Sequence, residues 1–296
     1  MIFYEDPEEQ KGSLWMRIFR NLMLGWAMFI ALFGVGLISL LILFPPGEAI
    51  YRSITDGGCE SGPTHRAVVD VGKATVLRVL GVRGDLSVEG RPGRATFQVE
   101  GRTCARIGSK RHLESIVLRT SHTGDEITVI ADMPARVDDI RMNLVILVPE
   151  GFPRVEVEHG DGPVSVNDVT ELQAVVGSGS LIATRIGGNV DVSSLDGSMA
   201  LVDVEGDVAV NAIHGYGEVD LAGIGGNVTI GDNQSGPARI SDIGGDVTIG
   251  SAGSGRLTVS DVAGDVSVDE NPGGHITLER IEGSVHLPGN EERPGT

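Results

Sequence analysis

Aliphatic residues recur at fixed distances from glycine throughout the second half of the chain. Between residues 162 and 287 one pattern occurs seven times: a glycine with apolar residues at the second, fourth and seventh positions after it. The opening glycines are Gly162, Gly179, Gly197, Gly217, Gly236, Gly255 and Gly274, and the last three intervals are each 19 residues. In six repeats a second glycine follows nine residues after the first. Such a period predicts an all-β parallel β-solenoid (β-helix) of about six to seven rungs, each rung being one turn of the coil.

The repeats also predict which side chains form the core. The apolar positions of each rung are mostly β-branched residues or leucine, which suit a buried, pleated surface. In four rungs the residues expected to point inward are Leu181, Ala183, Ile186, Val190, Val192, Val219, Leu221, Ile224, Val228, Ile230, Ala238, Ile240, Ile243, Val247, Ile249, Leu257, Val259, Val262, Val266 and Val268.

Short polar residues mark one corner of each rung. The residue after the second glycine is, in successive rungs, Asn189, Asp207, Asn227, Asp246, Asp265 and Ser284. Glycine reaches positive φ without steric cost, so we expect both glycines to turn the chain sharply. The polar side chains would stack about 4.8 Å apart, and each would form a hydrogen bond with the backbone of its own turn.

Residues 67–160 alternate between apolar and polar positions but lack a regular long repeat. Strands are predicted at residues 86–88, 95–99, 116–118, 127–129, 144–148 and 155–157. We expect a β-rich N-terminal part that joins and caps the solenoid of residues 161–287, and a separate small sandwich is the alternative. Residues 288–296 are polar and rich in proline and glycine, which predicts a disordered tail or a loose cap.

Leu22 to Phe44 is a run of 23 residues without a charged side chain. As a helix with about 1.5 Å rise per residue, this run crosses a hydrocarbon layer about 30 Å thick. The sequence therefore predicts one transmembrane helix over residues 22–44, between a cytoplasmic amphipathic tail (1–21) and a linker (45–66). A cleaved signal peptide and a buried core helix are the alternatives.

Basic residues flank this segment unequally. Lys11, Arg17 and Arg20 precede it, whereas only Arg52 follows within about 20 residues. An excess of basic residues marks the cytoplasmic side of a membrane. We therefore expect a single-pass protein of the bacterial inner (cytoplasmic) membrane, with its C-terminal domain in the periplasm or outside the cell.

Both cysteines, Cys59 and Cys104, fall on the predicted exported side. An oxidising compartment permits a disulfide between them, but one pair does not define a disulfide framework. The sequence leaves open whether the two cysteines pair.

The net charge of −18 is unevenly distributed along the chain. Residues 59–159 hold 14 acidic and 14 basic residues, whereas residues 160–296 hold 21 acidic residues and 5 arginines, a net charge of −16. An acidic surface repels the phosphates of nucleic acids, so nucleic-acid binding is not expected. It favours a cationic peptide, a basic protein partner or divalent cations.

No nucleophile elbow, phosphate-binding loop or zinc-binding motif occurs in the sequence, and no cofactor is expected other than Ca²⁺. Asp242 and Asp261 occupy equivalent positions in adjacent rungs, as do Asp246 and Asp265. Four carboxylates gathered at one corner would repel one another, and a hard cation such as Ca²⁺ would relieve that repulsion. The alternative is that these aspartates are solvated turn residues.

Several segments resemble a known bacterial family. Residues 144–151 (LVILVPEG), 155–157 (VEV) and 162–166 (GPVSV) are followed by units such as 244–249 (GGDVTI). Together they resemble the "putative adhesin" β-strand-repeat domain, over residues 67–287 and including a single N-terminal anchor, and they are similar to LiaG-type envelope proteins. The resemblance implies a solenoid fold and supplies no catalytic residues.

The sequence thus favours a membrane-anchored, non-enzymatic envelope protein whose acidic solenoid acts as a scaffold or as a binding or adhesion surface. One alternative is an accessory role in envelope-stress sensing, in which the protein binds cationic peptides or a basic partner. A polysaccharide-active β-helix enzyme is disfavoured, because only Phe97, Phe152 and Tyr216 are aromatic beyond residue 51. Exposed end rungs would also permit self-association through the ends of the solenoid.

Overall fold

The computed structural model describes residues 59–106, 110–134, 140–234 and 236–288. The predicted cytoplasmic tail, the transmembrane segment 22–44 and most of the linker lie outside these residues, as does the tail after residue 288. Among the described residues no helix is long and apolar enough to span a membrane. The linker was predicted too long at its C-terminal end, because a strand, β1, already begins at Cys59.

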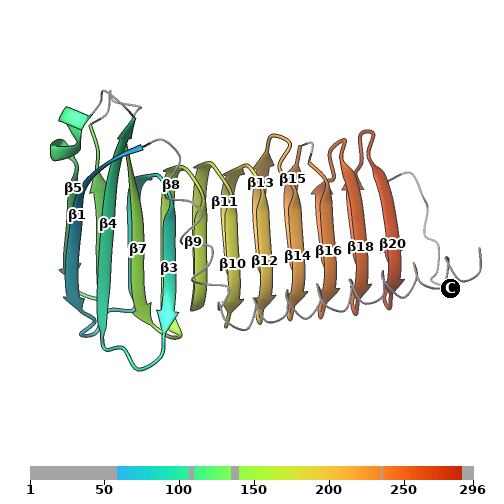
Figure 1. The fold of residues 1–296 in the computed structure, drawn as a ribbon. Coiled ribbons are helices and arrows are strands. Elements are labelled where there is room, and N and C mark those ends of the chain that lie inside the picture. Colours follow the sequence, from blue (N-terminus) through green and yellow to red (C-terminus); the bar gives the residue numbers. More distant parts are fainter. Residues whose placement is uncertain (1–58, 107–109, 135–139, 235, 289–296) are drawn as a thin grey trace, which may run out of the picture. The chain divides into compact units, whose positions relative to one another are not determined.

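The repeats form a parallel β-solenoid of about seven turns, as predicted (Figure 1). Each rung contributes one strand to each of two layers. The first layer contains the beginning of β9 (Val164–Ser178), then β10 (Leu181–Ile186), β12 (Met199–Val204), β14 (Val219–Ile224), β16 (Ala238–Ile243), β18 (Arg256–Val262) and β20 (His275–Ile281). The second layer contains the end of β9, then β11 (Val190–Asp196), β13 (Val208–His214), β15 (Val228–Asn233), β17 (Val247–Ser251), β19 (Val266–Glu270) and β21 (Val285–His286).

The N-terminal part continues both layers, so the alternative of a separate sandwich was wrong; the described chain from Cys59 onward forms one compact unit. In the first layer β9 pairs with β3 (Leu86–Arg91), which pairs in parallel with β7 (Ile140–Pro149). In the second layer β9 pairs with β8 (Phe152–Asp161), which pairs with β2 (Val76–Arg83), and β2 pairs with β6 (Glu126–Asp132). The unit β2–β3 therefore lies between strands that come later in the chain.

Antiparallel strands and a short helix cover the N-terminal end. In the first layer β4 (Thr96–Arg106) runs antiparallel to β7, and β1 (Cys59–Asp70) runs antiparallel to β4. In the second layer β5 (Val117–Thr123) runs antiparallel to β6. The 3₁₀ helix η1 (Lys110–Ser115) packs against β1 and β4, and Leu113 is buried there. Within the core of this part, Phe97 and Phe152 meet edge to face with ring centroids 5.0 Å apart.

All the predicted inward-facing residues are buried, in one continuous hydrophobic core. The strands stack in exact register: Leu181 pairs with Met199, Met199 with Val219 and Val219 with Ala238. Aliphatic side chains of successive rungs therefore lie directly above one another, as alternation along each strand requires. A further buried column, not predicted, lies at the ends of β11, β13, β15 and β17 and contains Leu195, Ile213, Asn233 and Ala252.

The expected positive φ is found at three glycines of the first corner, Gly162, Gly179 and Gly197, but not at Gly217, Gly236 or Gly274. At the second corner the expectation of positive φ is wrong. Gly179 has φ +155°, and a Cβ there would lie 2.0 Å from the carbonyl oxygen of Gly162 in the adjacent rung. At the second corner Gly245 lacks a positive φ, but a Cβ would lie 2.3 Å from Oδ1 of Asn227. The second glycine is therefore required by close approach between rungs and not by backbone conformation.

Candidate functional site

A ladder of hydrogen bonds joins the short polar residues at the second corner. In five steps the side-chain Oδ1 of one residue accepts a hydrogen bond from the backbone N–H of the equivalent residue in the next rung. The steps, with N···O distances, are Asn189 to Asp207 (2.9 Å), Asp207 to Asn227 (2.7 Å), Asn227 to Asp246 (2.8 Å), Asp246 to Asp265 (2.8 Å) and Asp265 to Ser284 (2.6 Å). The predicted stack is confirmed, but the observed bonds run to the backbone of the next rung and not to the residue's own turn, as had been expected.

A second column follows a bend in each first-layer strand. Its members have left-handed backbone conformation, with φ between +53° and +68°: Asp168, Arg185, Asp203, Gly223, Asp242, Asp261 and Arg280. The bend places two outward residues between the last two inward residues of the strand. The sequence carried a signal for it, because the apolar positions shift from a spacing of two to a spacing of three at this point.

Two arginines of this bend column bind the aspartate one rung away. The Arg185 guanidinium donates to both carboxylate oxygens of Asp168, at 2.6 and 2.7 Å, and Arg280 binds Asp261 in the same way at 2.5 and 2.7 Å. The hydrogen bond to Arg280 holds the pKa of the Asp261 carboxyl below its ordinary value. Gly223 interrupts the column between Asp203 and Asp242.

The four aspartates of the calcium hypothesis are divided between these two columns. Asp242 and Asp261 lie next to each other at the bend, since their flanking residues pair in register. Asp246 and Asp265 lie in the ladder, where Asp246 Oδ1 accepts from the Asp265 backbone. In the part of the chain that the structure describes, no group of three or more acidic, histidine or cysteine side chains is arranged to hold a metal ion. The calcium site stays a prediction without an assembled ligand set.

Cys104 lies on β4 and is disulfide-bonded. The backbone of Cys59, the other cysteine of the chain, lies on the neighbouring strand β1. The antiparallel register places Cys104 opposite Ser61, two residues along β1 from Cys59. The pairing of Cys59 with Cys104 stays a prediction, and this register is compatible with it.

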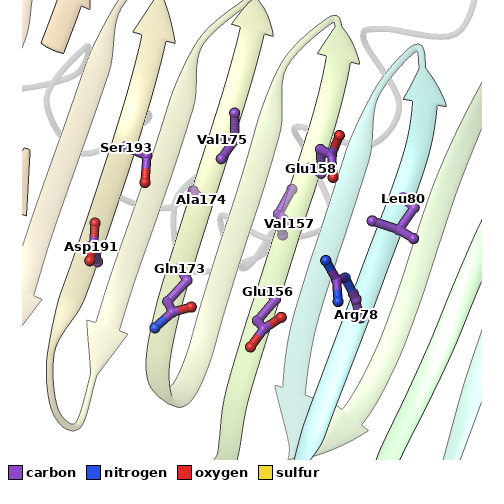
Figure 2. A pocket seen from close by; sticks show the side chains of 10 residues that line it. All are labelled: Arg78, Leu80, Glu156, Val157, Glu158, Gln173, Ala174, Val175, Asp191 and Ser193. Atoms are coloured by element: carbon purple, nitrogen blue, oxygen red, sulfur yellow. The ribbon is translucent and has the colours of Figure 1, made fainter. Parts of the chain in front are cut away.

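A shallow depression of about 180 Å³ lies on the outer surface of the second layer, across β2, β8, β9 and β11 (Figure 2). One row of its lining pairs directly from strand to strand: Arg78 with Glu156, Glu156 with Gln173, and Gln173 with Asp191. The remaining lining residues are Leu80, Val157, Glu158, Ala174, Val175 and Ser193.

The depression is acidic, with a partly apolar floor. Its lining holds three carboxylates against the single guanidinium of Arg78, and Val175 is 43% exposed. It can accept a positively charged group with an aliphatic stem, because the carboxylates attract the charge and the floor contacts the stem. Sequence reasoning missed this site because it joins strands that are not consecutive in the chain. The alternating acidic residues of β8 were the available signal.

Beyond this depression the second layer presents a flat surface of small side chains. Its exposed or half-exposed residues are Ala209, Asn211, Thr229, Gly231, Thr248 and Gly250, in two rows along the solenoid axis. In the first layer Ile182, 45% exposed, lies beside Ala200. Both surfaces are broad and lack deep relief, which suits contact with another macromolecule.

His159 is a buried titratable group near the depression. It lies at the end of β8 opposite Val176 of β9 and is only 3% exposed. Burial lowers the pKa of this imidazole below its ordinary value, although the nearby backbone of Gly162 and Asp161 opposes the shift. The side chain is therefore neutral at pH 7 and acts as part of the core.

No protein-family model matches this chain, and no curated protein matches it in sequence. Several solved structures resemble it. A "putative adhesin" from Bacteroides fragilis shares 11% identity, with a TM-score of 0.40 over 74% of this chain and 97% of that chain. A "putative lipid binding protein" from Parabacteroides distasonis shares 14% identity, with a TM-score of 0.37 over 76% of this chain and 97% of that chain. A "putative cell adhesion protein" from Clostridium sporogenes shares 12% identity, with a TM-score of 0.27 over 76% of this chain and 98% of that chain. The "putative adhesin" from Bacteroides fragilis carries the name of the family that the sequence resembles.

Proposed function

We propose that this protein is a non-enzymatic binding protein of the bacterial envelope, anchored in the cytoplasmic membrane by residues 22–44, with its solenoid outside the cytoplasm. The observation that carries the proposal is the contrast between interior and surface. Aliphatic side chains fill the rungs, and carboxylates gather on the outside, in the corner ladder, at the bend and in the depression. A partner would bind to such a protein across its surface.

The charge of the solenoid indicates the chemistry of the partner. Residues 160–296 carry a net charge of −16, and the depression on the second layer adds a local cluster of carboxylates. The negative charge of the solenoid would attract a cationic peptide or the basic surface of a protein at long range. Once bound, the partner would contact the carboxylates of the depression. Such binding serves adhesion or scaffolding. It would also serve an accessory role in sensing cationic peptides that stress the envelope.

The test is binding of a fluorescent arginine-rich peptide to the purified full-length chain, at low and at high ionic strength. Affinity should fall steeply as salt is added, since exposed charges are screened beyond the Debye length. An acidic peptide of equal length is the control and should not bind. Affinity that does not depend on salt would contradict the proposal.

Matched charge variants locate the contact. E156Q/E158Q removes two charges at the depression, and E205Q/E282Q removes two exposed charges elsewhere on the solenoid. The first variant should weaken peptide binding more than the second, although both have the same net charge. Equal weakening would mean that total charge, and not the depression, determines binding.

The anchor is tested separately by cell fractionation. The full chain should sediment with the membrane, and a chain lacking residues 22–44 should not, because no helix among the described residues is long and apolar enough to span the bilayer. Protease added outside spheroplasts should remove the solenoid. A protected solenoid would overturn the proposed orientation.

A further inference from the structure

The two ends of the solenoid differ in how their core is covered. At the N-terminal end η1 and the antiparallel strands β1, β4 and β5 close the core, and Leu113 and Ile116 are each 1% exposed. At the other end β20 and β21 pair only with β18 and β19 among the described residues. One long edge of β20 therefore carries backbone N–H and C=O groups without strand partners there.

Inward side chains of the last rung are also incompletely covered. Ile276, Leu278 and Val285 are half-buried, whereas the equivalent Leu257, Val259 and Val266 of the preceding rung are at most 2% exposed. Every earlier rung is covered by the rung that follows it. The last rung thus presents an apolar edge that the addition of one more strand to each layer would complete.

The sequence of this edge is complementary to a second copy of itself. If two copies of β20 pair antiparallel about Thr277, Ile276 lies opposite Leu278 of the other copy, and His275 lies opposite Glu279. Both inward residues then face inward residues, as a continuous core requires.

Neighbouring registers fit less well. Pairing about Leu278 would set Ile276 opposite Arg280, which points outward at the bend and is bound to Asp261. Pairing about Glu279 would set two carboxylates directly opposite each other, which is unfavourable. The register about Thr277 combines two apolar pairs with two pairs of histidine and glutamate.

We propose that two copies of this chain join end to end through the open edge of β20, about a twofold axis at Thr277. The contact is isologous, so it closes as a dimer and does not propagate into a filament. The covered N-terminal ends remain at the two extremities of the pair, because β1 lies at the opposite end of the described unit from β20 (Figure 1). The occupant of the open edge is thus a second copy.

A single cysteine placed on the axis tests this arrangement in the full-length chain. In T277C the two new thiols would lie directly opposite each other, and mild oxidation should convert most of the protein into a covalent dimer. T258C is the matched control, since Thr258 pairs with Thr277 one rung earlier and lies on β18, whose two edges are both paired. T258C and the parent chain should form no covalent dimer under the same conditions.

A second variant keeps the proposal falsifiable. T277C/L278K places charges in the apolar pair and should lose the covalent dimer, while circular dichroism should show that it keeps the β-sheet content of T277C. If T277C forms no more dimer than T258C, the proposal is overturned. Dimer formation that begins only after removal of residues 289–296 would overturn it as well, because the chain's own tail would then be the occupant.

Discussion

Asn227 and Asp246 lie at equivalent corners of adjacent rungs, and the Asn227 side-chain Oδ1 accepts a hydrogen bond of 2.8 Å from the Asp246 backbone N–H. The bond runs between rungs, so it links two turns of the solenoid that are separate in sequence. The same bond is repeated along the corner. The side chain of each inner residue of the ladder therefore accepts a hydrogen bond from the next rung, and its backbone N–H donates one to the previous rung. The corner thereby contributes to the register of the stack.

Replacing Asn227 by alanine should destabilise the solenoid. The substitution removes the acceptor for Asp246 N–H, and loss of such a bond costs about 0.5–1.5 kcal/mol. Chemical denaturation of N227A would measure this as a lower midpoint with an unchanged slope. T229A, two residues away on the exposed face, is the control and should change stability by less than about 0.5 kcal/mol. Equal effects of the two variants would contradict the role of the ladder.

Alanine in place of glycine should have different effects at two positions of the second corner. In G245A the new Cβ would lie 2.3 Å from Asn227 Oδ1, and we expect a loss of about 1–3 kcal/mol from overpacking. In G187A no atom lies within 4 Å of the new Cβ and φ is not positive, so stability should stay the same or rise by up to about 1 kcal/mol. Thermal melting of G245A and G187A compares the two positions directly. If both variants are destabilised, the requirement for glycine comes from backbone conformation and not from close approach between rungs.

Stability should decrease on mild acidification because of His159. Burial lowers the pKa of its imidazole in the folded state below the ordinary value of 6.5, so the unfolded chain binds more protons. The stability that the folded state gains from keeping His159 neutral is present in full above pH 6.5. It is lost as the pH falls from there toward the lower pKa of His159 in the folded state. Denaturation at several pH values should show that H159V loses less stability on acidification than the parent chain. Valine is chosen because Val176 occupies the paired position in the next rung. H122Q, at an exposed position on β5, should retain the parent's behaviour.

Mass spectrometry without reduction should recover a peptide pair that joins Cys59 to Cys104. The disulfide would tie β1 to β4 at the N-terminal end, and its removal in C104S should cost about 2–4 kcal/mol. S61A, directly opposite Cys104, is a control that leaves both cysteines in place. Recovery of alkylated Cys59 from unreduced protein would contradict the pairing.

Much of the solenoid could be predicted because each rung repeats the same spacing of glycine, apolar and polar residues. A buried strand position such as Val259 is identified by its distance from the preceding glycine, and its burial is confirmed. The stacking of Asp246 on Asp265 followed from the same period. The depression at Arg78 could not be predicted, because it depends on which strands become neighbours.

The sequence by itself determined the inward positions of the rungs, their corners and their parallel stacking, since in a repeat the contacts of one rung with the next are all of one kind. The tertiary structure decided the insertion of β2 and β3 between later strands, the ion pair of Arg185 with Asp168, and the acidic depression. In the N-terminal part no period links one strand to its partner. There, pairing is selected by the fit of whole layers across long separations in sequence, which no local pattern records.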